Sequence, residues 1–161
     1  METALIKDMG RNYIEAVKSY EDEIADNSTP DSYINLAFLY WSFAFELFEF
    51  NNPNNITEDY SVIGGNRYKI ILDLGLSNYP SNLELHFWEK YFQHIIFSDE
   101  FSEKDCQKLL KEYGDSGSIV PYFFLYLFDK EKYKQKRNEL LDICNEYPTA
   151  KNIYIKSIIE K

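Results

Sequence analysis

The stretch SNYPSNLELHFWEKYF (77–92) contains Tyr79 followed by proline, and this Tyr-Pro pair recurs later in the chain. The second pair begins at Tyr147, and Tyr113 lies midway between the two. The spacing is 34 residues in each interval, which is typical of repeats built from paired helices. The sequence therefore predicts a repeated helical unit of this length.

The residues before each tyrosine are apolar and lie on one face of a helix, at spacings i, i+3, i+4 and i+7. Three such groups occupy the same positions of the 34-residue interval: Leu72, Gly75 and Leu76; Cys106, Leu109 and Leu110; Leu140, Ile143 and Cys144. Capping-box patterns at 102–105 and 81–84 mark helix starts, and the two prolines mark helix ends. The predicted unit is helix, turn, helix.

These signals predict one all-α domain over residues 1–161, a right-handed stack of about four helical hairpins. We expect helices at about 4–27, 31–50, 66–78, 82–97, 102–113, 118–128, 131–146 and 150–160. The segment 51–66 is rich in Asn and Gly and exceeds the repeat length, so it is expected to be an inserted loop in which Gly64 and Gly65 turn the chain into the next helix.

Two segments resemble the tetratricopeptide-repeat (TPR) family. YINLAFLY (33–40) is similar to the first-helix pattern of that family, with Tyr33, Leu36, Ala37 and Tyr40 as its aromatic, leucine, small and tyrosine positions. YPSNLELHFWEKY (79–91) resembles the half-TPR pattern, in which proline is followed by tryptophan and tyrosine. The resemblance implies an α-solenoid that binds other proteins.

The net charge of −10 is concentrated in the first two thirds of the chain. Residues 1–105 contain 7 Lys and Arg against 19 Asp and Glu, whereas residues 106–161 contain 10 against 8. An anionic surface repels nucleic acid and anionic membranes and accelerates encounter with basic proteins. We therefore predict a basic protein partner, with no nucleic-acid or membrane partner. The alternative is that the acidity serves only solubility.

Targeting signals are not evident in the sequence. The first ten residues lack a secretory pattern, and the longest apolar stretch, 36–45, is about half as long as a membrane-spanning helix. We expect a small, soluble, cytoplasmic protein that is complete in itself.

Residues suited to catalysis or metal binding are sparse. His86 and His94 lie eight residues apart on one predicted helix, too far apart to share a metal without a further ligand. Cys106 and Cys144 fall on apolar helix faces and are predicted to be core residues. We therefore expect no cofactor, no metal and no catalytic residue. A remote alternative is a small enzyme that uses His94 and nearby carboxylates.

Aromatic residues are abundant, with 14 Tyr, 12 Phe and 2 Trp. The predicted helix 31–50 is apolar all round, so either the inserted segment 51–66 packs over it or part of it is exposed as a partner-binding surface. We predict a partner-binding surface with three aromatic anchors and two charges: Phe38, Trp41, Phe45, Glu46 and Glu49. The predicted function is non-catalytic protein binding, most specifically that of an acidic immunity or antitoxin protein that neutralises a basic toxin. The alternative is a TPR-like peptide-binding adaptor or co-chaperone scaffold.

Overall fold

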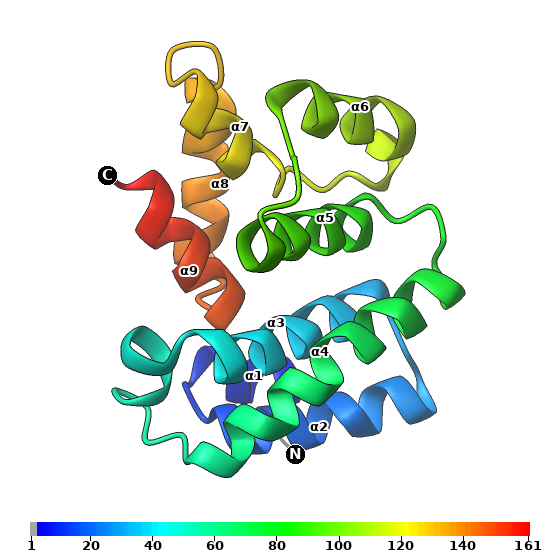
Figure 1. Cartoon of the computed structure of the whole chain (residues 1–161), viewed down its shortest axis with the longest axis vertical. Helices are drawn as coiled ribbons and strands as arrows, with labels where there is room; N and C mark the ends of the chain where they lie inside the picture. The colour runs from blue at the N-terminus through cyan, green and yellow to red at the C-terminus, as the bar shows by residue number, and fades with distance from the viewer. Residues whose placement is uncertain (1–2) are drawn as a thin grey trace.

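The computed structural model describes residues 3–161, and this part of the chain contains helices and no β-strand (Figure 1). The all-α prediction is confirmed. In chain order the elements are α1 (Ala4–Met9), α2 (Tyr13–Asp26), α3 (Pro30–Phe45), the π-helix η1 (Leu47–Asn51), α4 (Glu58–Asn78), α5 (Leu83–Phe97), α6 (Glu103–Tyr113), the 3-10 turn η2 (Gly114–Ser116), α7 (Tyr122–Phe128), α8 (Lys134–Glu146) and α9 (Ala150–Ile159).

The expected first helix, 4–27, is in fact two helices, α1 and α2. Arg11 adopts a left-handed conformation with a φ of 64°, which a continuous right-handed helix does not contain. Gly10 caps α1, and its amide donates to the carbonyls of Ile6 and Asp8. The break allows α1 to fold back and pack against α2.

The expected loop over 51–66 is also shorter than predicted, because α4 already begins at Glu58. Gly64 and Gly65 therefore lie inside a helix and do not form a hinge. Gly64 faces α3 so closely that a β-carbon on it would lie 2.2 Å from the carbonyl oxygen of Tyr40. The physical reason for this glycine is the close approach of the two helices.

The three tyrosines that define the 34-residue spacing each lie at the end of a helix. Tyr79 caps α4, Tyr113 is the last residue of α6, and Tyr147 caps α8. One apolar position of each group, occupied by Leu72, Cys106 and Leu140, is at most 1% exposed in all three helices. The prediction that these three segments are helices is confirmed, but the shared apolar face is buried only in part, because Ile143 is 40% exposed.

Helices that are neighbours in the sequence pack against one another, and α3 and α4 make the most extensive contact. Helices α1 to α4 gather at one end of the molecule, α5 lies in the middle, α6 and α7 lie at the other end, and α8 and α9 run beside α5 toward α3 (Figure 1). The last helix returns to contact α3. It also reaches α1, because the amide of Ala150 donates a hydrogen bond of 2.8 Å to Oδ1 of Asp8.

Helix α3 forms the centre of the core, and it contacts α2, α4, α5 and α9. Every residue from 32 to 43 is buried. Trp41 stacks on Phe92 of α5 with ring centroids 4.8 Å apart, and Phe38 packs against both Trp88 and Tyr154. The apolar character of this helix on all sides is therefore explained by neighbours that cover it.

The buried carboxyl group of Asp8 predicts a pH-dependent stability. Its two oxygens accept hydrogen bonds from Tyr20 Oη and the amide of Ala150, yet burial raises its pKa from 3.8 to about 6. A carboxyl group with a raised pKa contributes stability that is complete below about pH 4 and is lost as the pH rises through about 6. We expect the free energy of unfolding of the wild type, relative to Asp8→Asn, to fall by roughly 2 to 3 kcal/mol over this range.

Urea denaturation of both proteins between pH 4 and pH 7 measures this difference. Asp22→Asn, at an exposed position of α2, is the control and is expected to follow the pH course of the wild type. A constant difference between the wild type and Asp8→Asn at all pH values would show that Asp8 is not perturbed.

Candidate functional site

The structure separates the five residues predicted to bind a partner. Phe38 and Trp41 are 2% and 1% exposed and belong to the core, so the prediction that they are surface anchors is wrong. Their rings are covered by α5 and α9, which follow far later in the chain. Phe45, Glu46 and Glu49 lie together at the end of α3 and the start of η1.

Residues 45–49, called the acid–aromatic surface, lie where α3 ends and η1 begins. Three apolar side chains are exposed on it: Phe45 by 44%, Leu47 by 45% and Phe48 by 82%. Glu46 has φ −113° and ψ 53°, which ends α3 and redirects the chain. The ring of Phe45 is held edge-on against Tyr68 of α4, with centroids 5.6 Å apart. Phe48 has by far the most exposed ring of the three.

The two carboxyl groups of this surface lie close to each other. Burial, and then the charge and hydrogen bonding of Glu49, raise the pKa of Glu46. Burial together with both carboxylates raises the pKa of the nearby Tyr154 to about 12. Among residues 3–161, the ion pairs include neither Glu46 nor Glu49. A cation brought to this surface would therefore meet two carboxylates that form no ion pair within residues 3–161.

The two histidines have packing roles in the structure. His86 stacks on Tyr113 with centroids 4.1 Å apart, and its Nε2 lies 2.7 Å from the carbonyl oxygen of Pro80. His94 lies in a shallow depression with Asp99 and Glu100, but its Nδ1 is bonded to the main-chain oxygen of Asp99 at 2.8 Å. Neither ring forms an ion pair with a carboxylate in the described residues.

The cysteines are both buried and free. Burial raises the pKa of Cys106 to about 12 and that of Cys144 to about 11, so both thiols stay protonated at neutral pH. Within residues 3–161, no group of three or more His, Cys, Asp or Glu side chains is arranged to hold a metal ion. In the same range, no helix has both the length and the apolarity needed to cross a membrane.

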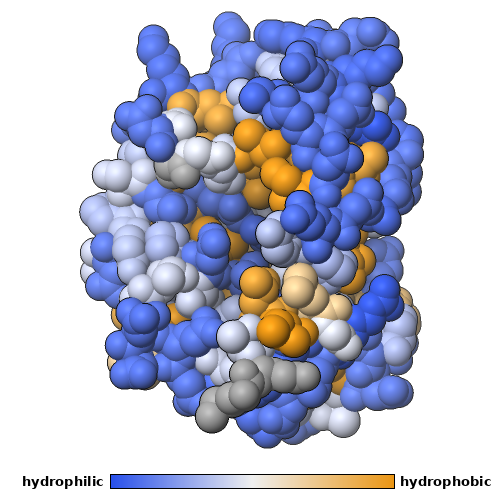
Figure 2. Space-filling model, turned by 180° about the vertical axis from the view of Figure 1, so that it is seen from behind, coloured by the Kyte–Doolittle hydropathy of each residue, from blue (hydrophilic) through white to orange (hydrophobic). Residues whose placement is uncertain are grey.

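A cleft of about 820 Å³ lies between α8 and the starts of α3, α5 and α9. Leu5 of α1 and the segment 117–120 complete its lining. Figure 2 shows several patches of apolar surface, with hydrophilic surface between them, on the side of the molecule opposite to the view of Figure 1. The volume is in the range of clefts that bind small molecules or single side chains of a partner.

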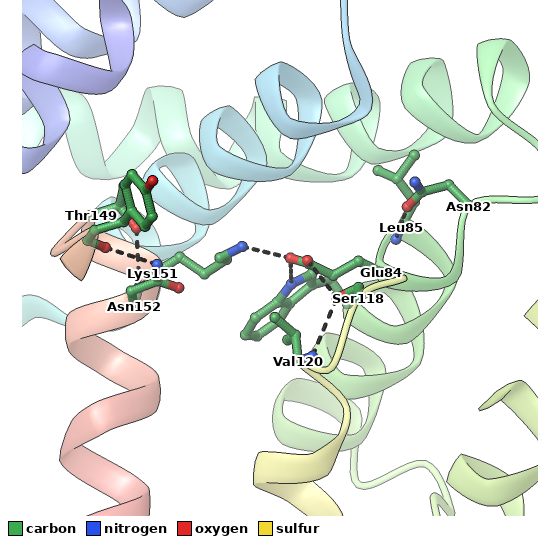
Figure 3. Close-up of polar contacts among 10 residues, drawn as sticks. Asn82, Glu84, Leu85, Ser118, Val120, Thr149, Lys151 and Asn152 are labelled. Atoms are coloured by element: carbon green, nitrogen blue, oxygen red, sulfur yellow. Dashed lines mark hydrogen bonds and ion pairs between the residues drawn. The ribbon is translucent and has the colours of Figure 1, made fainter. Parts of the chain in front are cut away.

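A buried ion pair forms one wall of this cleft. Lys151 at the start of α9 extends to Glu84 at the start of α5 (Figure 3), and its Nζ lies 2.7 Å from Glu84 Oε2. The same carboxylate accepts hydrogen bonds of 3.0 Å from Trp88 Nε1 and Ser118 Oγ. The two charged side chains are 11% and 8% exposed, so the pair is screened little by solvent.

The sequence did not reveal this wall. The pattern at 81–84 suggested that Glu84 would cap its own helix, but Asn82 is the cap and accepts from the amide of Leu85 at 3.0 Å. Lys151 lies 67 residues from its partner, and no local pattern links the two.

Two further polar side chains line the cleft from α3. Asp31 lies at its mouth, where burial and the charge of Glu84 raise the pKa of its carboxyl group. Asn35 is 8% exposed, and its Oδ1 has no hydrogen-bond partner among the described residues. The two residues are one helical turn apart and therefore share a face.

No protein-family model, curated protein or solved structure matches this chain.

Proposed function

We propose that this protein is a non-catalytic binding domain that captures a basic protein through the acid–aromatic surface. The observation that supports it most directly is the exposed ring of Phe48 beside Glu46 and Glu49, whose carboxylates form no ion pair within the part of the chain that the structure describes. Exposed aromatic rings beside charges are typical of the residues that contribute most to protein interfaces.

The charge of the chain favours a basic partner. The net charge is −10, and the excess of acidic residues lies in residues 1–105, which include this surface. Electrostatic attraction between an acidic and a basic protein accelerates their encounter, and salt weakens this attraction. A small acidic protein with one such surface is suited to the role of an immunity protein or antitoxin that occludes a basic toxin.

We also propose that the hairpins α2–α3, α4–α5, α6–α7 and α8–α9 are a degenerate, right-handed stack of the TPR type. The regular placement of Tyr79, Tyr113 and Tyr147 at helix ends supports this relationship. The contact of α9 with α3 is a departure, because each repeat of an open solenoid contacts only its neighbours. A peptide-binding adaptor is the second candidate function, and the cleft beside α8 favours it.

Capture of partners from the native host tests the proposed function. The immobilised wild type is expected to retain one basic protein with nanomolar affinity, and salt is expected to slow the association. The double variant Phe48→Ser, Glu49→Lys should weaken binding by roughly 100-fold or more, because it removes the exposed ring and reverses a charge. Surface plasmon resonance with the purified partner measures both effects.

Phe97→Ser is the matched control, since Phe97 is an exposed aromatic residue, 66% exposed on α5, that is not among residues 45–49. It should bind the partner like the wild type, and circular dichroism should show equal helix content in all variants. Unchanged affinity of the double variant would rule out the acid–aromatic surface. Retention of many weak ligands would favour the peptide-binding adaptor.

A further inference from the structure

The shallow depression around His94, called the aromatic depression, is lined by α7 and by the connection from α5 to α6. Its volume is about 520 Å³. Phe101 and Phe124 are buried beneath it, with nearly parallel rings whose centroids lie 4.7 Å apart. Leu127 and Phe128 at the end of α7 are 50% and 49% exposed in its lining. Exposed apolar surface with polar residues at its edge is typical of sites where another protein docks.

The connection from α5 to α6 gives the depression an acidic side, and its main chain is held in place. Ser98 has a left-handed φ of 58°, and its amide donates to the carbonyl of His94. The Nδ1 atom of the same histidine lies 2.8 Å from the main-chain oxygen of Asp99. Asp99 and Glu100 are exposed and form no ion pair within residues 3–161. This side therefore presents two carboxylates from a fixed backbone.

The α7 side continues into a basic segment. Residues 129–137 follow α7 directly and contain five Lys and Arg against two Asp and Glu, whereas residues 98–105 contain one against four. The ammonium group of Lys132 lies 4.0 Å from a carboxylate of α6. Lys130 and Lys134 are exposed and belong to no ion pair among the described residues. Charges of both signs thus remain available beside the apolar residues.

A second copy of this chain is complementary to such a surface. In a dimer with two-fold symmetry the same surface of both copies meets itself, so each side of it contacts the other side in the partner. An apolar centre between an acidic and a basic side suits this symmetry, because each acidic side then meets a basic one and the contact forms twice.

The distribution of charge along the chain also favours contact between copies at this end. Residues 1–80, which include α1 to α4, contain 5 Lys and Arg against 13 Asp and Glu, whereas residues 81–161 contain 12 against 14. Helices α1 to α4 lie at the opposite end of the molecule from α6 and α7 (Figure 1). Two copies that meet through α7 therefore keep their most acidic parts apart, and physiological salt screens repulsion beyond about 8 Å.

We propose that the aromatic depression is the interface of a homodimer with two-fold symmetry. Leu127 and Phe128 of the two copies pack together at its centre. The acidic segment 98–105 of each copy lies against the basic segment 129–137 of the other. This dimer does not depend on the acid–aromatic surface.

Sedimentation velocity over a range of concentrations tests the proposal. The wild type is expected to change reversibly from 19.2 kDa to twice that mass, with a Kd in the micromolar range, as for other small interfaces. Phe128→Ser is expected to weaken dimerisation by roughly tenfold or more, because it removes a central ring from both copies. Val62→Ser is the control, since Val62 is 62% exposed on α4, and it should dimerise like the wild type.

Two charge-reversed proteins test the symmetry of the interface. The first is Asp99→Lys, Glu100→Lys, in which both sides are basic, and the second is Lys130→Glu, Lys134→Glu, in which both sides are acidic. Each is expected to dimerise at least roughly tenfold more weakly than the wild type, because like charges meet in its dimer. An equimolar mixture of the two should form a heterodimer about as tight as the wild-type dimer, since opposite charges meet again at both contacts.

Asp22→Lys, Asp26→Lys changes the net charge as much as the first reversed protein, but at exposed positions of α2, and should dimerise at least as tightly as the wild type. A wild type that stays monomeric up to about 1 mM would overturn the proposal. So would a dimer that Phe128→Ser leaves intact, a mixture of reversed proteins that does not associate, or masses beyond two copies. The Phe48→Ser, Glu49→Lys protein should dimerise like the wild type, so failure of this interface and failure of the proposed function are distinguished.

Discussion

Replacement of Gly64 by alanine is expected to lower the free energy of unfolding by about 3 to 5 kcal/mol. The added β-carbon would lie 2.2 Å from the carbonyl oxygen of Tyr40 and 3.0 Å from Cβ of Phe43. The first of these atoms belongs to the main chain of α3, so it cannot turn aside as the end of a side chain can. To accommodate the methyl group, α4 must move away from the central helix of the core, along their extensive contact.

The neighbouring Gly65 provides a matched control. A β-carbon there would lie 3.8 Å from Cβ of Ala44, which is an ordinary van der Waals contact. Since alanine favours helices more than glycine does, Gly65→Ala is expected to raise the free energy of unfolding by up to about 1 kcal/mol. Urea denaturation of both variants measures the two effects. If both substitutions stabilise the protein, Gly64 of α4 does not lie against the main chain of α3 at Tyr40.

Replacement of Lys151 by methionine is expected to destabilise the protein by about 3 to 5 kcal/mol. The variant keeps a side chain of similar length but leaves the carboxylate of Glu84 buried without its cation. Trp88 and Ser118 still donate to that carboxylate, but neutral donors do not compensate its charge. The same denaturation experiment at neutral pH measures the loss.

Lys156→Met is the matched control for this prediction, because Lys156 lies on the same helix. Its ion pair with Glu160 is 3.6 Å long, and the two side chains are 38% and 51% exposed. Exposed ion pairs contribute little to stability, so Lys156→Met is expected to lower the free energy of unfolding by less than about 1 kcal/mol. Adding Glu84→Gln to Lys151→Met should recover part of the stability, since it removes the uncompensated charge. Equal losses from the two lysine substitutions would contradict the importance of the buried pair.

Local signals in the sequence predicted the positions of most helices. The capping box at Ser102 is present in the structure, and the tyrosines at 79, 113 and 147 end their helices. These features depend on residues within a few positions of one another, so the sequence alone is informative about them. The apolar character of residues 31–50 left open whether this helix is covered or partly exposed, and the choice of Phe38 and Trp41 as exposed anchors was wrong.

Features that depend on distant residues could not be predicted. Whether Phe38 and Trp41 are exposed is decided by α5 and α9, and the sequence does not show that α9 returns to α3. The Gly64-Gly65 pair suggested a loop because glycine disfavours helices, and only the closeness of α3 explains why it lies within one. The pairing of Glu84 with Lys151 was missed for the same reason.

The return of α9 has a consequence for the order in which the chain becomes stable during synthesis. Asp8 and Glu84 are both buried, and the groups that bond to them from α9, the amide of Ala150 and the ammonium of Lys151, follow 142 and 67 residues later. A ribosome has therefore made the other eight α-helices described here before either carboxyl group meets its α9 partner. Until then, neither carboxyl group has its partner from α9, and the surface that α9 covers is open to water. We expect the earliest helices to become stable only when α9 leaves the exit tunnel, so that the emerging chain stays open to chaperones and proteases for most of its synthesis.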